Sequence, residues 1–317
     1  MSGSSGLRGR DLVGIADLAP AELERLLDRA AELKAELRAR REHRDRPLRN
    51  RTVALIFEKP SLRTRVTFET GILQLGGHPV DLASGEIGLG VRESVRDIAR
   101  NLSRWVDAIV VRTFAHAVVE ELAAEADVPV INALTDLEHP CQALADLLTL
   151  RERFGRTAGL VVAYVGDPNN VYHSLLLAGV MSGLEVRLAR PPGYEPDPGI
   201  LARAERLAAA GHGRVILGHD PRAVVRGADV VYTDTWISMG REAEAAERRR
   251  AFAGYRVDAA LLDTAGPETL VMHCLPAHRG EEITADVLDG PRSIVLDQAE
   301  NRLHAQKAFL AECLGDG

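Results

Sequence analysis

The stretch "HPCQALADLLTLRERFG" (139–155), followed closely by "GLVVAYVGD" (159–167), decides how this chain is organised. The first stretch places apolar residues at helical spacing, whereas the second is a continuous apolar run that ends in a Gly-Asp turn. A long amphipathic helix that leads into a fresh strand is typical of a link between two separate sheets. We therefore expect residues 139–155 to form a bridging helix between two domains.

Short apolar runs alternate with longer helical patterns on both sides of this helix. The runs are rich in Val, Ile and Leu and lack the polar alternation of a half-exposed strand. Strands of this kind, separated by helices, indicate parallel sheets that are covered on both faces. The expected strands are 52–57, 107–111, 128–131, 160–165, 184–189, 214–217, 229–233, 269–274 and 293–297.

The two ends of the chain have helical patterns. An amphipathic helix enters through Pro20 and carries apolar residues with charged residues between them. A last helix is expected over 298–314, where it ends the second sheet and packs back on the first domain. The predicted fold is α/β: two parallel-sheet domains bridged by two long helices, with 1–149 plus 298–317 in one domain and 150–297 in the other.

The bulk properties of the chain exclude several classes of protein. Its 317 residues suffice for two domains, and a formal net charge of -7 argues against a broad nucleic-acid surface. Three cysteines provide neither a disulfide framework nor zinc spacing, which suits a reducing compartment. No signal peptide is recognisable, and no apolar run reaches the about 18 residues of a membrane span. We expect a soluble, cytoplasmic protein without nucleic-acid or membrane partners.

Polar residues follow the apolar runs and form two clusters. In open parallel sheets, ligands bind beyond the carboxyl ends of the strands, so these residues are the first candidates for a site. The cluster in the first half is cationic, and the cluster in the second half contains amides, acids and a thiol. The first consists of Ser61, Arg63, Thr64, Arg112 and "EHPCQ" (138–142), and the second of "GDPNN" (166–170), "DTWISMG" (234–240) and "HCLPAHRGEE" (273–282).

The stretch "FEKPSLRTRVTFE" (57–69) suits a phosphate. Ser61 stands where the N-cap of a helix is expected, so that backbone N–H groups of the first turn point outward. Arg63 and Arg112 can each present a planar fork to phosphate oxygens. Spacing alone leaves open an exposed helix face whose ion pairs join Arg63 and Arg65 to Glu58 and Glu69.

The members of the second cluster, and His139 of the first, are ambiguous when they are taken singly. "GDPNN" lacks the three glycines of a dinucleotide-binding loop, so no such cofactor is expected. Simpler interpretations are turn residues for Asp167 and Asp234, and core residues for His139, His273 and Cys274. All of them fall at the same edge of the predicted sheets, however, and this coincidence favours a site.

Five stretches of the chain resemble the signature blocks of ornithine carbamoyltransferases, within the aspartate/ornithine carbamoyltransferase superfamily. The resemblance runs from about residue 10 to the C-terminus, and its blocks keep the family's order. The first two blocks mark the whole superfamily, whereas the third and fourth point to ornithine rather than aspartate. The blocks are "FEKPSLRTRVTFE", "HPCQALADLLTL", "DTWISMG", "HCLPAHRGEE" and "DQAENRLHAQKA".

The resemblance implies transfer of the carbamoyl group from carbamoyl phosphate to the side-chain amine of ornithine, without a metal or other cofactor. It makes 1–149 plus 298–317 the carbamoyl-phosphate-binding domain and 150–297 the ornithine-binding domain, in a homo-oligomer that is a trimer or a multiple of trimers. The residues that it assigns to carbamoyl phosphate are Ser61, Leu62, Arg63, Thr64, Arg112, His139, Gln142, Cys274, Leu275 and Arg302. Those that it assigns to ornithine are Asn170, Asp234, Ser238 and Met239, and the expected catalytic residues are Arg112, His139, Asp234 and Cys274.

Two positions depart from the family pattern. Leu62 stands where the phosphate loop often has Thr, which removes one hydroxyl but leaves a backbone N–H as a donor. Gly88 stands where many members place a Gln or His that reaches the phosphate of a neighbouring subunit. Arg92, four residues later, is a candidate to replace that contact.

The sequence also predicts roles within the second cluster. A carboxylate beside an ammonium favours the charged form, so Asp234 is expected to orient the amine rather than deprotonate it. Cys274 is expected to act as an orienting thiol and not as a covalent nucleophile. Residues 238–250 are a candidate lid. The alternatives are a carbamoyltransferase for putrescine or acetylornithine, and an inactive phosphate-binding paralogue; the completeness of both clusters favours the ornithine enzyme.

Overall fold

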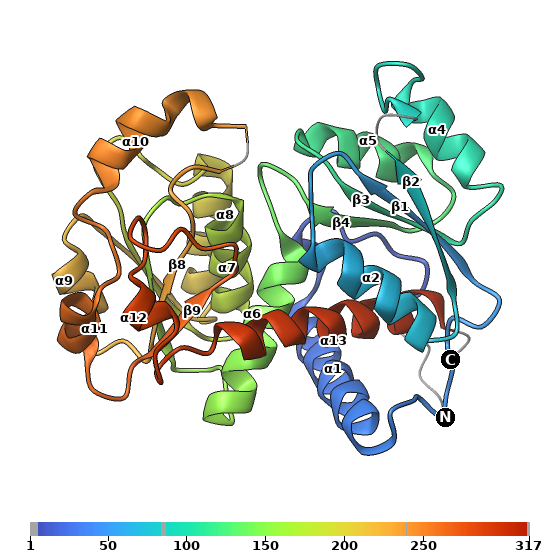
Figure 1. Ribbon diagram of the computed structural model, residues 1–317. Helices are drawn as coiled ribbons and strands as arrows, with labels where there is room; N and C mark the ends of the chain where they lie inside the picture. Colours follow the sequence, from blue (N-terminus) through green and yellow to red (C-terminus); the bar gives the residue numbers. More distant parts are fainter. Residues whose placement is uncertain (1–5, 84–86, 239, 316–317) are drawn as a thin grey trace. The chain divides into compact units, whose positions relative to one another are not determined.

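The computed structural model of this chain describes residues 6–83, 87–238 and 240–315. It consists of two compact units (Figure 1). The first unit comprises Met1–Leu148 with Glu300–Gly317, and the second comprises Thr149–Ala299. The chain leaves the first unit within α6 (Pro140–Phe154) and returns to it within α13 (Val295–Leu314). Two long helices therefore carry residues of both units, as expected for bridging helices.

The first unit contains a four-stranded parallel sheet in the order β2-β1-β3-β4. Its strands are β1 (Thr52–Phe57), β2 (His78–Ala83), β3 (Ala108–Arg112) and β4 (Val130–Leu134). Phe57 is in register with Arg112, so the loops that follow β1 and β3 start at the same edge. Apart from Thr52 at its start, the residues of β1, β3 and β4 are buried, as strands covered on both faces require.

Helices cover both faces of this sheet. Residues of α4 and α5 share one core with Ile56, Ile109 and Val111, and α2 and α13 lie on the other face (Figure 1). Packing of α2 against α13 is close, because a Cβ atom on Gly71 would lie 3.0 Å from Cγ of Lys307. The helical elements of this unit, besides α6 and α13, are η1 (Ile15–Asp17), α1 (Pro20–Arg40), α2 (Arg63–Gln74), α4 (Val95–Leu102) and α5 (His116–Glu125).

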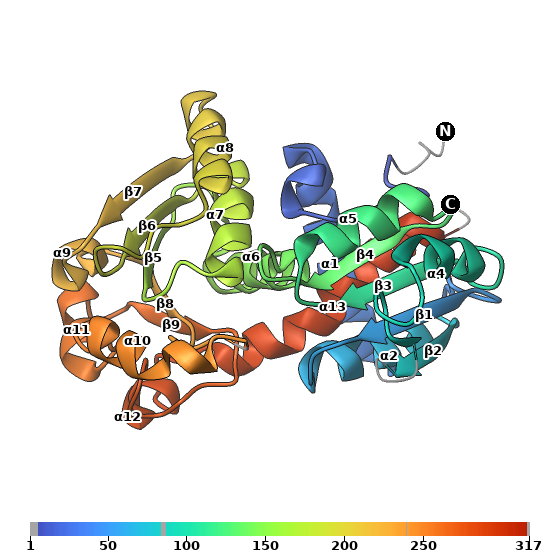
Figure 2. The same cartoon turned by 90° about the horizontal axis from the view of Figure 1, so that it is seen from above.

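The second unit contains a five-stranded parallel sheet in the order β7-β6-β5-β8-β9 (Figure 2). Its strands are β5 (Val161–Val165), β6 (Glu185–Ala189), β7 (Arg214–Gly218), β8 (Val230–Thr233) and β9 (Leu270–His273). From β5 the chain builds β6 and β7 on one side and β8 and β9 on the other. The loops after β5 and β8 therefore flank the point where the strand order reverses, which is where open α/β sheets bind ligands.

The helices of the second unit begin at residues suited to that position. Asn169, Asp197, Asp220 and Asp258 each cap a helix with a side-chain oxygen that accepts from backbone N–H groups. Among the described residues, no helix is both long and apolar enough to cross a membrane. The helical elements are α7 (Asn170–Met181), α8 (Pro198–Ala209), α9 (Pro221–Val225), η2 (Glu242–Glu244), α10 (Ala245–Phe252), α11 (Ala259–Ala265) and α12 (Ala285–Leu288).

Two features of the strand prediction are wrong. The run 293–297 is not a strand: Ser293 forms a single bridge with Val271, and the helix α13 already begins at Val295. Pairing stops there because the following residues enter the first turn of that helix. The strand β2 was not predicted, since it is an edge strand that contains Pro79 and has no fully buried residue.

Candidate functional site

The loop after β1 leads into the helix α2, whose first residue is Arg63. Leu62 occupies the N-cap position with helical backbone angles (φ −78°, ψ −63°) and makes no side-chain cap. The prediction that Ser61 caps this helix is therefore wrong by one residue. Leu62 is 73% exposed, so its apolar side chain does not close the helix N-terminus. A helix N-terminus in this position favours anions.

The hydroxyl of Thr64 accepts hydrogen bonds from two arginines that are distant from each other in the sequence. Its Oγ1 accepts from Nη1 of Arg112 (3.3 Å) and from Nη2 of Arg302 (3.1 Å). Arg302 also donates through Nη1 to Oε1 of Gln142 (2.7 Å), and Gln142 donates through Nε2 to Oδ1 of Asp146 (2.8 Å). These contacts bring together side chains from α2, β3, α6 and α13.

The charge of this group suits an anion. Arg112 is 7% exposed and Arg302 is 2% exposed, so two guanidinium groups that share one hydroxyl acceptor are almost removed from water. Burial of this kind strengthens the interaction of an arginine fork with a carboxylate or phosphate. Arg65 behaves differently, because it pairs with Asp81 and lies 4.7 Å from the ring centroid of Phe57. In the ion-pair alternative, Arg65 was to pair with a glutamate, but its partner in the structure is Asp81.

His139 lies immediately before α6 and is 4% exposed. Burial lowers the pKa of His139 well below its usual value, and the positive charges of Arg302, Arg112 and Arg63 lower it further. The imidazole is therefore neutral at neutral pH. A neutral ring can donate one hydrogen bond to a ligand oxygen without adding a further cation to the group.

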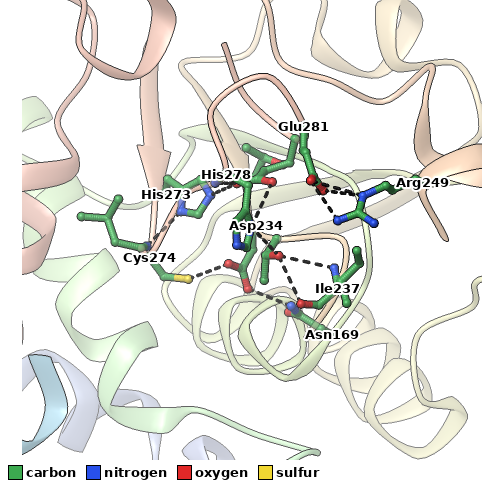
Figure 3. Close-up of polar contacts among 12 residues, drawn as sticks. Asn169, Asp234, Ile237, Arg249, His273, Cys274, His278 and Glu281 are labelled. Atoms are coloured by element: carbon green, nitrogen blue, oxygen red, sulfur yellow. Dashed lines mark hydrogen bonds and ion pairs between the residues drawn. The ribbon is translucent and has the colours of Figure 1, made fainter. Parts of the chain in front are cut away.

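In the second unit, the carboxylate of Asp234 is held by both of its oxygens (Figure 3). The thiol of Cys274 donates to Oδ1 (3.0 Å), and Nδ2 of Asn169 donates to Oδ2 (2.8 Å). Asn169 is itself fixed as the N-cap of α7, since its Oδ1 accepts from the N–H groups of Val171 and Tyr172. Asp234 is only 6% exposed, so these two donors and not water set the orientation of its carboxylate.

His273 has a structural role. Its Nδ1 accepts from the backbone N–H of Leu275 (2.9 Å), so the proton of the neutral ring is on Nε2, which donates to Oε1 of Glu282 (3.2 Å). Glu282 is fully buried and also accepts from the backbone N–H of His278 (2.5 Å). The ring of His278 in turn lies 3.1 Å from Oγ1 of Thr235. This network orders the turn after β9 (Figure 3).

Among the residues 6–83, 87–238 and 240–315, the side chains of Asp234, His273 and Cys274 form a group whose ligand atoms lie within 4.8 Å of one another, close enough for a metal ion. Both ring nitrogens of His273 already make hydrogen bonds, however, so a metal would have to break one of them. The expectation that the protein needs no metal stays a prediction.

The structure brings several of the expected residues into two groups, one in each unit. Thr64, Arg112, Gln142 and Arg302 contact one another in the first unit. Cys274 contacts Asp234 in the second unit, where Leu275 follows it with a left-handed φ of 58°. Ser238 lies four residues beyond Asp234 and is half-buried, whereas Met239 is outside the described residues.

Two residues of these groups were not singled out from the sequence, although Asn169 lies within the predicted stretch 166–170. Asn169 contacts Asp234; its neighbour Asn170, which the resemblance assigns to ornithine, begins α7, and its Oδ1 accepts from the N–H of Val171. Asp146 anchors Gln142 from one turn further along α6. A signal existed for the first, because an Asn directly before an apolar helical pattern is a preferred N-cap. The second follows from the spacing of i and i+4 on one helix face.

The fold and the two groups define a class: a two-domain α/β enzyme with an anion site in one unit and an acid–thiol–amide site in the other. Residues 10–152 match the family profile "Aspartate/ornithine carbamoyltransferase, carbamoyl-P binding domain". Residues 158–313 match "Aspartate/ornithine carbamoyltransferase, Asp/Orn binding domain". The chain belongs to the aspartate/ornithine carbamoyltransferase family.

Individual relatives resemble the chain over almost its full length. A protein from Parafrankia, named ornithine carbamoyltransferase, is 55% identical over 95% of this chain and 94% of its own length. One of the same name from Symbiobacterium thermophilum is 54% identical, with 96% of this chain and 97% of the relative covered. The solved structure of ornithine carbamoyltransferase from Pyrococcus furiosus is 50% identical, with a TM-score of 0.95 over 98% of this chain and 99% of that one.

Proposed function

We propose that this protein is an ornithine carbamoyltransferase, which transfers the carbamoyl group of carbamoyl phosphate to the side-chain amine of L-ornithine and yields L-citrulline and phosphate. The observation that carries the proposal is the convergence of Arg112 and Arg302 on Thr64, because Thr64 and Arg112 lie within the residues that match the carbamoyl-phosphate-binding profile. Relatives that are 55% and 54% identical over nearly the whole chain bear the same name.

In this proposal the predicted domain 1–149 plus 298–317, which contains the first unit, binds carbamoyl phosphate. The phosphate group lies at the N-terminus of α2, where backbone N–H groups and the Arg63 fork are available. The carbamoyl oxygen is met by donors that are already fixed, among them the neutral ring of His139 and the guanidinium of Arg112. The residues assigned to this substrate are Ser61, Leu62, Arg63, Thr64, Arg112, His139, Gln142 and Arg302, with Cys274 and Leu275 of the second unit.

The predicted domain 150–297, which makes up most of the second unit, binds ornithine. Asn170, Ser238 and Met239 are assigned to ornithine, and Asp234 orients its side-chain amine. Because a carboxylate stabilises an ammonium, Asp234 does not by itself remove the proton. The Cys274 thiol that donates to Asp234 reduces the negative charge available at one carboxylate oxygen, which favours the loss of the amine proton.

The chemistry requires little beyond alignment and charge stabilisation. The lone pair of the amine attacks the carbamoyl carbon, the bond from that carbon to the phosphate oxygen breaks, and the amine loses one proton. Carbamoyl phosphate is an activated mixed anhydride, so its own leaving group drives the transfer. Alignment of the two substrates contributes several kcal/mol, and the donors at the carbonyl oxygen contribute a further share.

A homo-oligomer, either a trimer or a multiple of trimers, located in the cytoplasm, is part of the same proposal. Gly88 is a turn residue with a left-handed φ of 57°, and a Cβ atom there would lie 2.8 Å from Cβ of Arg92. A Gln or His at this position would therefore strain the backbone, which explains the glycine, and Arg92 is the candidate contact to a neighbouring subunit. Light scattering that shows a monomer with full activity would contradict this part.

The test is citrulline formation from carbamoyl phosphate, with ornithine, putrescine, acetylornithine and aspartate offered in parallel. We expect product with ornithine alone. Product with a different amine would keep the first unit's role and overturn the assignment of the second. No product with any acceptor, while carbamoyl phosphate still raises the melting temperature, would favour an inactive phosphate-binding paralogue.

A further inference from the structure

Arg248, in α10, ties separate segments of the second unit together. Its Nη1 donates to Oδ2 of Asp167 (2.9 Å) and to the carbonyl oxygen of Trp236 (3.1 Å), and its Nε donates to Oε2 of Glu244 (2.8 Å). The guanidinium also lies 5.3 Å from the ring centroid of Tyr194. The side chain of Arg248 is only 8% exposed, so these contacts form a nearly buried junction.

The two segments that Arg248 joins are the ones that carry the proposed ornithine contacts. Asp167 lies in the loop after β5, two residues before Asn169, which holds the carboxylate of Asp234. Trp236 lies in the loop after β8, midway between Asp234 and Ser238. One guanidinium group thus bonds both loops at the edge of the sheet where the strand order reverses.

We propose that Arg248 is a positioning residue for the amine substrate: it fixes the loop 234–238 against the loop 166–170 and so sets the orientation of Asp234 and Ser238. This inference rests on the proposed function, because ornithine is the substrate assigned to those loops. Arg248 does not contact the substrate in this proposal. It acts through the carbonyl of Trp236 and the carboxylate of Asp167.

The chemistry of the side chain explains why this position needs arginine. A planar guanidinium donates in several fixed directions at once, whereas a lysine ammonium is a compact charge that cannot reach the same acceptors together. Removal of the guanidinium would also leave Asp167 as a buried carboxylate without its ion-pair partner, and such a change destabilises a site strongly.

The junction depends on the charge of Asp167. Burial raises the pKa of Asp167 to about 6, and the negative charge of Asp234 also raises it. The guanidinium group of Arg248 lowers this pKa, and the more weakly acting charge of Arg241 lowers it as well. Glu244 faces the same guanidinium and keeps it charged. Asp167 is therefore ionised at pH 7, and its ion pair with Arg248 weakens as the pH falls through about 6.

The neighbouring Arg249 provides a matched control. It occupies the next position of α10 and has the same side chain, but it is 53% exposed and pairs with Glu281 (3.0 Å) at the surface (Figure 3). Substitution of Arg249 therefore removes an arginine from the same helix without removing a contact to Asp167 or Trp236.

Trp236 provides a reporter that does not depend on turnover. The chain contains two tryptophans; Trp236 is 5% exposed and stacks on Phe252 with ring centroids 6.0 Å apart, whereas Trp105 is 70% exposed and belongs to the first unit. In a Trp105→Phe background, fluorescence therefore reports on the loop 234–238 alone.

The first experiment measures acrylamide quenching of Trp236 in this background, with Arg248→Met, Arg249→Met and Asp167→Asn compared at pH 7.5. We expect stronger quenching for Arg248→Met and an unchanged value for Arg249→Met. In the parent, quenching should rise as the pH falls through about 6, and the isosteric Asp167→Asn should lack that transition. Equal quenching in the Arg248 and Arg249 variants would overturn the proposal.

The second experiment measures kinetics for the same variants and for Arg248→Lys. For Arg248→Met we expect a rise in the KM for ornithine of about tenfold or more, with the dissociation constant for carbamoyl phosphate unchanged. Arg248→Lys should be intermediate. An unchanged ornithine KM in an enzyme that makes citrulline contradicts the positioning role and leaves the proposed function intact. A parent enzyme that makes no citrulline contradicts the proposed function, and the quenching data then decide whether Arg248 fixes the loop.

Discussion

The anion group of the first unit and the carboxylate group of the second are built in different ways. In the first, the side chains of Thr64, Arg112, Gln142 and Arg302 bond to one another, and every one of these residues is buried. In the second, Asp234 is oriented by a helix-capping Asn169 and by the half-buried Cys274, within loops tied by Arg248. The first group is fixed before a ligand arrives, whereas the second depends on how its loops are held.

This difference matches the proposed substrates. A phosphate carries its charge on several oxygens and gains most from rigid donors in a dry site. An amine must be held by a carboxylate and still lose a proton, so its partner must not bind the ammonium too tightly. The comparison predicts that changes in the first group affect carbamoyl phosphate and the rate together, while changes in the second act mainly on ornithine.

The largest expected effect is that of Arg112→Met, which removes a fixed donor from the first group. We expect kcat/KM to fall by about 10²–10³-fold, the loss typical for one preorganised donor. Arg65→Met is the control, because Arg65 pairs with Asp81 outside the group and its loss should change kcat/KM little. Similar losses for both variants would show that the charge of α2, and not the bonded group, binds the anion.

The next effect is that of Cys274→Ala, which removes the donor to Asp234. A hydrogen bond to a charged group contributes about 1.5–3 kcal/mol, so we expect turnover to fall by roughly ten- to a hundredfold while some activity remains. Cys313→Ser, at a buried thiol of the first unit, should leave turnover unchanged. Complete loss of activity in Cys274→Ala, with carbamoyl phosphate still bound, would point to covalent chemistry at this thiol.

The sequence predicted the parts of the fold that depend on local pattern. The strands β1, β3 and β5 have continuous apolar runs because helices cover both faces of the sheets, and α1 has one buried face beginning after Pro20. The run 293–297 has the composition of a strand, but its partner Val271 pairs with it at Ser293 only. The secondary structure of residues 293–297 therefore depends on tertiary pairing, which the local pattern does not contain.

The sequence predicted several of the residues that belong to the candidate site but not the contacts between them. Arg63, Thr64 and Arg112 stand out because they follow buried runs, whereas Arg302 entered only through the resemblance, since nothing in the helix around it marks a ligand contact. That Thr64 accepts from both Arg112 and Arg302 depends on strand register and on the packing of α13. Such contacts join residues that are distant in sequence, so no local pattern reveals them.

A smaller effect concerns acid stability of the first unit. Burial lowers the pKa of His304 to about 3, and the positive charge of Lys307 lowers it further. Because the unfolded chain binds this proton at a higher pH than the folded chain, stability is complete above about pH 6.5 and is lost as the pH falls toward 3. His304→Gln should make the melting temperature depend less on pH between 6.5 and 4. An unchanged slope would contradict this assignment.

The smallest effect is that of Leu62→Thr, which restores the hydroxyl that the family's phosphate loop often has. Leu62 is exposed at the start of α2, so the change should not affect the core. We expect the affinity for carbamoyl phosphate to rise by about two- to fivefold, within the range of one exposed hydrogen bond. No change in the dissociation constant would show that the backbone N–H at this position already suffices.

The central claim is that the first unit binds carbamoyl phosphate and the second binds ornithine. Binding measured without turnover tests this claim most directly. The melting temperature is followed with carbamoyl phosphate or with ornithine, for the wild-type protein, Thr64→Val and Asp234→Asn. The account predicts that Thr64→Val loses the shift caused by carbamoyl phosphate and that Asp234→Asn keeps it. The shift caused by ornithine is measured with saturating phosphate present, and of the two variants only Asp234→Asn should weaken it. Loss of the carbamoyl phosphate shift in Asp234→Asn, with Thr64→Val unaffected, would contradict the assignment of the two groups.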